Sequence, residues 1–103
     1  MDAKQTKQLI RKFFATRYET TSATELRNDH GVKAGMSKDR VDDVVVGTSY
    51  FYRSQNHTAA FVKEFTEFCK GEGVEVTVVS DIEFKTKDWP NTSWAEQTVR
   101  LSK

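Results

Sequence analysis

The chain has 103 residues, of which 16 are Lys or Arg and 15 are Asp or Glu, so its formal net charge is +1. Aromatic residues make up 12% of it, and Cys69 is the single cysteine. A near-zero net charge with this aromatic content excludes a disordered polyelectrolyte, and one cysteine excludes a disulfide scaffold. The length suits one compact domain, so we expect a single α+β domain over residues 1–103.

The N-terminal sequence MDAKQTKQLIRKFFATRY carries charges throughout. A secretory signal needs an apolar stretch of roughly 7–15 residues, and a membrane span needs about 20. No apolar run in the chain approaches either length. With a lone cysteine, this pattern predicts a cytoplasmic protein without a membrane partner.

The same N-terminal segment has the 3.6-residue period of an amphipathic helix. Asp2 and Gln5 have the spacing of a capping box, and the polar residues 20–22 lower helix propensity, so we expect the helix to end at Arg17 or Tyr18. Its apolar face comprises Leu9, Ile10, Phe13 and Phe14.

A second helix is predicted from about Asn56 to Gly71, because glycine is a natural residue at a helix end. Its apolar face comprises Phe61, Val62, Phe65, Phe68 and Cys69.

The C-terminal third has the two-residue period of strands. Residues 74–86 alternate between apolar and polar positions without a change of phase, which predicts one long strand. Residues 88–93, DWPNTS, predict a turn, and a second alternating segment follows it, so we expect a C-terminal β-hairpin. If its last strand, ending at Leu101, lies at the sheet edge, it could pair with a second copy, and a homodimer is one expected arrangement.

The middle of the chain allows two interpretations. β-branched and aromatic residues predict a strand over 44–53, with Glu19–Arg27 favoured as its antiparallel neighbour across a loop over Asn28–Asp39. The alternative is a short helix, because Ser22 and Glu25 also have capping-box spacing. The favoured order, α-β-β-α-β-β, predicts an antiparallel sheet of about four strands with two helices on one face.

Charge is distributed unevenly along the chain. Residues 2–17 carry a net charge of +4 and residues 63–83 a net charge of −4. Lys4, Lys7 and Arg11 form a stripe on the first predicted helix, with Lys12 beside it, and such a stripe can contact phosphates. A solvated helix face is the commoner explanation, so nucleic-acid binding is kept as an alternative function.

Both tryptophans fall on the solvent side of the predicted hairpin, among charges of both signs. Aromatic residues surrounded by charges have the composition of a binding hot spot. The alternative is that the first helix or a long side chain covers the two rings, or that they stack on each other and lock the turn. The candidate protein-binding residues are Trp89, Asn91, Trp94, Lys87 and Glu96.

Residues suited to catalysis or metal binding are sparse. Zinc sites need three or four ligands, and neither His30 nor His57 has a second His or Cys at ligand spacing. Cys69 lies on an apolar helix face, where a buried thiol is ordinary. We expect no metal, no cofactor and, on balance, no enzyme, with a histidine-containing pocket as the remaining enzymatic alternative.

The leading expectation is therefore a small cytosolic module that binds a protein partner as an adaptor or inhibitor. Small stand-alone chains of this kind are common among regulators and among accessory proteins of phages and mobile elements.

Overall fold

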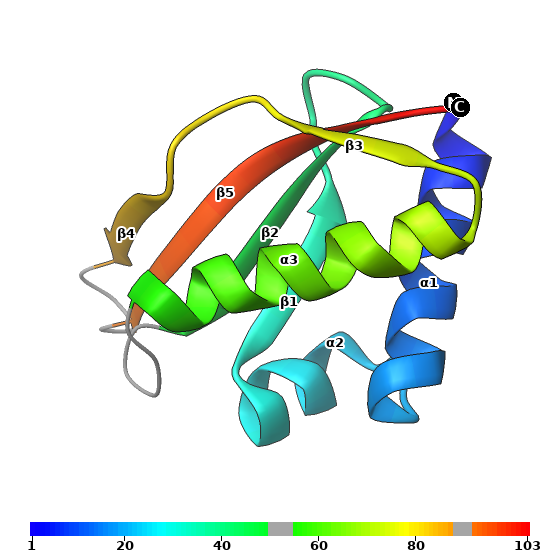
Figure 1. Ribbon diagram of the computed structural model, residues 1–103. Helices are drawn as coiled ribbons and strands as arrows, with labels where there is room; N and C mark the ends of the chain where they lie inside the picture. The colour runs from blue at the N-terminus through cyan, green and yellow to red at the C-terminus, as the bar shows by residue number, and fades with distance from the viewer. Residues whose placement is uncertain (50–54, 88–91) are drawn as a thin grey trace.

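The computed structural model describes residues 1–49, 55–87 and 92–103, without the side chains of residues 55, 56, 87 and 92. Its helices and antiparallel strands form an α+β arrangement, as predicted (Figure 1). The elements are α1 (Ala3–Tyr18), α2 (Ala23–Glu25), the π-helical turn η1 (Leu26–His30), β1 (Val32–Met36), β2 (Asp43–Ser49), α3 (Gln55–Gly71), β3 (Glu75–Val78), β4 (Glu83–Lys87) and β5 (Thr92–Ser102).

The two long helices form where their periodicity predicts them. Asp2 and Gln5 complete the capping box of α1, with Asp2 Oδ1 accepting from the Gln5 amide at 2.8 Å. The helix ends at Tyr18, and Glu19 adopts a left-handed conformation with φ 59°. The second predicted helix is α3, which begins one residue before Asn56 and ends at Gly71.

Residues 23–30 are helical, so the favoured strand over Glu19–Arg27 is wrong. Ser22 Oγ accepts a hydrogen bond from the Glu25 amide at 3.3 Å, and Gly31 ends the segment with φ 64°. These caps satisfy helix-terminal backbone groups locally, and they outweigh the β propensity of the threonines. The strand of this region is β1, which lies within the predicted loop over Asn28–Asp39.

All strand pairs in the sheet are antiparallel. The order is β1-β2-β5-β3, and β4 also pairs with β5. Since β2 occupies one side of β5, β3 and β4 share the other side. The predicted edge position of the strand ending at Leu101 is therefore wrong, and self-pairing through that strand loses its basis.

The predicted long strand over residues 74–86 is divided into β3 and β4. From the pair Val78–Val99 to the pair Glu83–Glu96, this segment advances five residues while β5 advances three. Two extra residues are thus accommodated opposite Thr98, whose carbonyl accepts from the amides of Val79 and Ser80. Because two residues are inserted, the apolar and polar positions stay in phase, and the alternation does not reveal the break between β3 and β4. With this break the sheet has five strands.

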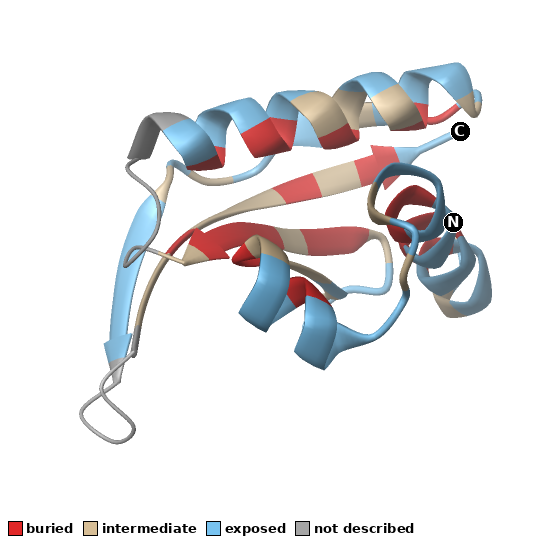
Figure 2. Ribbon diagram, turned by 90° about the horizontal axis from the view of Figure 1, so that it is seen from below, coloured by how far each residue is buried: buried red, intermediate tan, exposed pale blue. Residues whose placement is uncertain are grey.

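The helical segments contribute to one core on one face of the sheet. Phe13 of α1 contacts the rings of Phe61, Phe65 and Phe68 of α3, with ring centroids 5.2 to 5.8 Å apart. Leu26 joins this core from η1. Figure 2 shows the buried residues of α3 on the side that faces the sheet. The sheet contributes Val32, Val44, Val46, Val99 and Leu101 to the same core.

Alternation along the strands sends a second set of side chains to the opposite side of the sheet, which we call the open face. By register, the open face comprises Lys33, Gly35, Asp43, Val45, Gly47, Ser49, Glu75, Thr77, Glu83, Lys85, Trp94, Glu96, Thr98, Arg100 and Ser102.

Candidate functional site

An ion pair spans three strands on the open face. The register aligns Lys33 of β1, Gly47 of β2 and Glu96 of β5 in one row. Lys33 Nζ lies 2.9 Å from Glu96 Oε2, so the two side chains meet above β2. Gly47 makes room for this contact, because a Cβ there would lie 2.8 Å from the carbonyl oxygen of Ala95 and 3.0 Å from Glu96 Cβ.

Trp94 lies in the neighbouring row, between Ser49 of β2 and Lys85 of β4. Its ring is half-buried, and Lys33 Nζ lies 4.7 Å from the ring centroid. This is the geometry of a cation–π interaction. One ammonium group therefore contacts both the Trp94 ring and the Glu96 carboxylate, and it holds the indole in a defined position on the open face.

Strand β4 extends the charged part of the open face. Glu83 lies directly opposite Glu96, where two like charges repel each other. Each carboxylate has its own lysine: Lys33 pairs with Glu96, and Lys85 Nζ lies 3.0 Å from Glu83 Oε2. The hydrogen bond and charge of Glu83 raise the pKa of Lys85. The surface around Trp94 thus alternates from positive to negative and back to positive.

At the far end of the open face, Arg100 forms a bidentate pair with Asp43. The distances are 2.7 Å from Nε to Oδ1 and 3.1 Å from Nη2 to Oδ2. In the turn before β2, Arg40 forms a second bidentate pair with Asp42, and its hydrogen bond lowers the pKa of Asp42 to about 2. The Arg100–Asp43 pair joins strands β5 and β2, whereas the Arg40–Asp42 pair lies within one turn.

Two of the five candidate protein-binding residues, Trp94 and Glu96, lie on the open face. Lys87 is the last residue of β4, and its side chain lies outside the described residues. Trp89 and Asn91 also lie outside the described residues. Whether the two tryptophans stack therefore stays a prediction.

Lys33, the residue that connects Trp94 with Glu96, is not among the candidate residues that the sequence predicts. It lies in the predicted loop over Asn28–Asp39, although Val32, Ala34 and Met36 alternate with Lys33 and Gly35 in a short two-residue period. That alternation was the available signal. Its partner at Glu96 could not be read from the sequence, because the contact depends on the register of three strands.

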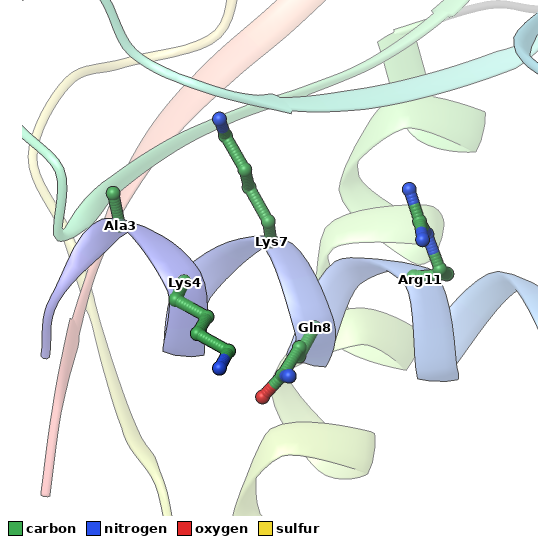
Figure 3. Close-up of a pocket in the computed structure, with 5 residues that line it drawn as sticks. All are labelled: Ala3, Lys4, Lys7, Gln8 and Arg11. Carbon is green, nitrogen blue, oxygen red and sulfur yellow. The ribbon is translucent and has the colours of Figure 1, made fainter.

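The cations proposed for the nucleic-acid alternative lie along α1. Lys4, Lys7 and Arg11 line a shallow hollow of about 510 Å³ together with Ala3 and Gln8 (Figure 3). Figure 3 shows Lys7 and Arg11 pointing to one side of the helix and Lys4 to the other. The fourth cation, Lys12, forms an ion pair with Glu72 just beyond α3.

The single thiol and His30 lie in structural contacts. Cys69 is fully buried in the core, and burial together with the Glu72 charge raises the pKa of its thiol to about 12. The His30 ring meets the Tyr18 ring edge-on at a centroid distance of 4.9 Å. His57 is exposed near the start of α3. The described residues hold no group of three or more His, Cys, Asp or Glu side chains placed to bind a metal ion.

No helix within residues 1–49, 55–87 and 92–103 combines the length and the apolar character that crossing a membrane requires. No protein-family model, curated protein or solved structure matches the chain. Inference about its function therefore starts from the open face and from α1.

Proposed function

We propose that this protein is a non-enzymatic module that binds a protein partner through the open face around Trp94, as an adaptor or inhibitor. The observation that supports this is the half-buried Trp94 ring, held by Lys33 on the sheet face opposite the core. Tryptophan is enriched among residues that dominate binding energy. A side chain already held in place loses little conformational entropy when a partner covers it.

The charges around Trp94 would orient the partner rather than provide most of the affinity. Lys33, Glu96, Glu83 and Lys85 are partly exposed and paired with one another. Exposed charges at the rim of an interface mainly affect association rate and specificity. The partner surface should therefore present an apolar pocket for the indole, bordered by charges of both signs.

The cytoplasm is the compartment we propose for this activity. Cys69 is free and buried, as expected of a protein that folds where thiols stay reduced. Its thiol is protonated at neutral pH because its pKa is about 12, so it is not an activated nucleophile. This supports a binding role over a thiol-based enzyme.

Nucleic-acid binding through α1 is a second candidate with less support. Lys4, Lys7 and Arg11 line one hollow, but Lys12 already pairs with Glu72. Three phosphate contacts would give a slope of log affinity against log salt of about −3 for duplex DNA. A salt titration of a fluorescent duplex, with Lys4→Gln/Lys7→Gln/Arg11→Gln as comparison, decides this candidate.

Photo-crosslinking tests the protein-binding proposal. Benzoylphenylalanine would replace Val45 or Thr98 on the open face, and Val78 in a control protein, since Val78 is exposed and shares the other face with Val99. In lysate of the organism that encodes the chain, the proposal expects one partner to crosslink from positions 45 and 98. Crosslinks to a partner only from position 78 would contradict it, as would none from positions 45 and 98.

A further inference from the structure

A second hollow lies on the core side of the sheet, between α1, the α2–η1 segment and the edge strand β1. Its volume is about 330 Å³, at the low end of ligand pockets. Buried residues line its interior, among them Ile10, Phe14 and Leu26, and Ala34 and Met36 line it from β1. A hollow of this size accepts one or two side chains rather than a folded domain.

The charge of this hollow is positive. Lys7 and Arg11 both line it, both are exposed, and none of its lining residues within the described part of the chain is acidic. No salt bridge to either cation is found among the described residues. An occupant with carboxylate groups would therefore pair with cations that have no ionic partner among the described residues.

The outer edge of β1 carries backbone groups that have no hydrogen-bond partner among the described residues. The Ser49 amide donates to the Gly31 carbonyl and the Ser37 amide to the Asp43 carbonyl, each at 2.8 Å. In an antiparallel ladder, hydrogen-bonded pairs of opposite residues alternate with pairs that are not hydrogen-bonded. These two bonds therefore identify which β1 residues bond to β2. By this alternation Lys33 and Gly35 bond to β2. Ala34 and Met36 direct their N–H and C=O groups away from it.

Strand β1 also lies at an edge of the sheet, where a further strand can pair with it. Among the described residues β1 is the terminal strand of the sheet, with β2 as its strand partner. The outward groups of Ala34 and Met36 lie in the same strand segment that lines the hollow. An added strand would place every second side chain on the core side, toward the hollow and the two cations.

From these observations we propose that the hollow beside β1 binds an extended acidic peptide segment, which adds to the sheet at Ala34 and Met36 and pairs with Lys7 and Arg11. A second copy of this chain is disfavoured as occupant, because pairing two β1 edges would bring the same cations together. The inference goes beyond the proposed function, because this hollow lies on the core side of the sheet and Trp94 on the open face.

Fluorescence anisotropy with defined peptides tests the proposal. The probe is a fluorescein-labelled peptide of about seven residues, the length of an ordinary strand, in which Glu alternates with Val. One reference peptide has Lys in place of Glu, and the other has Pro in place of the central Val, which removes a backbone donor. The proposal expects the acidic peptide to bind at least about tenfold more tightly than either reference.

Charge variants on α1 identify the site. The double substitution Lys7→Glu/Arg11→Glu should lower the affinity for the acidic peptide at least about tenfold, and the variant should bind the Lys peptide more tightly than the acidic one. Lys4→Glu is the matched control, because Lys4 is exposed on the same helix and does not line this hollow. Equal weakening by Lys4→Glu would overturn the proposal in favour of a diffuse electrostatic attraction.

Amide hydrogen exchange tests the added strand directly. The amides of Ala34 and Met36 should be protected only when the acidic peptide is bound, whereas the Gly35 amide should be protected in both states. Binding without new protection at Ala34 and Met36 would overturn the proposal. So would tighter binding of a DNA duplex that depends on Lys7 and Arg11.

Trp94→Ala separates this proposal from the proposed function. It should leave the affinity for the acidic peptide unchanged, because Trp94 projects from the open face of β5. If the peptide does not bind but a partner still binds the open face, this proposal alone fails. If the peptide binds but no partner binds the open face, the proposed function alone fails.

Discussion

Lys33 and Glu96, which are distant in sequence, form an ion pair of 2.9 Å that crosses the central strand β2 above Gly47. A partly exposed pair of this kind contributes little to stability. The ion pair instead positions the Trp94 ring, because the Lys33 ammonium group lies 4.7 Å from the centroid of that ring. The Trp94 side chain is thus already held in place on the open face, where a partner could contact it.

Gly47→Ala should destabilise the protein by about 1–3 kcal/mol, as overpacking does in a tightly packed site. The added Cβ would lie 2.8 Å from the Ala95 carbonyl oxygen, and that backbone atom cannot move freely. Urea denaturation measures the change in free energy of unfolding.

Gly35→Ala is the matched control for Gly47→Ala. Gly35 also lies in a strand, and a Cβ there would meet no atom within 4 Å. This substitution should be neutral or stabilising by up to about 1 kcal/mol. Equal destabilisation by both substitutions would mean that Gly47 has no special steric role.

Lys33→Ala should expose the Trp94 ring without unfolding the protein. In a Trp89→Phe background Trp94 is the remaining tryptophan, so acrylamide quenching reports its accessibility. We expect a larger quenching constant for Lys33→Ala and a stability change within about 1 kcal/mol. Lys12→Ala serves as the control, because it removes a lysine that pairs with Glu72 away from the open face. An unchanged quenching constant in Lys33→Ala would contradict the positional role of Lys33.

Two buried hydroxyls connect α3 to the sheet. Thr48 Oγ1 lies 2.5 Å from Thr58 Oγ1, which also donates to the Ala95 carbonyl at 3.4 Å. Thr58→Val should cost about 1–3 kcal/mol, because the Thr48 hydroxyl would stay buried without this partner. Thr48→Val/Thr58→Val should recover part of that loss in chemical denaturation. Strictly additive losses would show that the two hydroxyls are not coupled.

The Asp42 pair predicts a loss of stability in acid. Its pKa is lowered from 3.8 to about 2, mainly by the hydrogen bond from Arg40. A lowered folded-state pKa stabilises the fold above the unfolded-state pKa, and this stability is lost as pH falls from about 4 toward about 2. Over that range the wild type should lose more stability than Asp42→Asn in urea titrations. Parallel losses would contradict the pairing.

The sequence predicts elements correctly where one local signal dominates, and it fails where local signals compete or where the register of several strands decides. The period of Leu9, Ile10 and Phe13 and the Asp2 cap predicted α1 correctly. The caps at Ser22 and Gly31 competed with β propensity, and the sequence alone favoured the wrong outcome. The placement of Trp94 followed from alternation, but the contact with Lys33 required the pairing of β1, β2 and β5.

The central claim is that Trp94 provides the main contact with a protein partner. The most direct test is the dissociation constant of the crosslinked partner, once purified, for the wild type and for Trp94→Ala. Loss of a hot-spot side chain costs about 2 kcal/mol or more, so affinity should fall at least about thirtyfold. Val78→Ala, a change at an exposed apolar residue beside the other face, should bind as the wild type does. A Trp94→Ala affinity within about twofold of the wild type would contradict the claim.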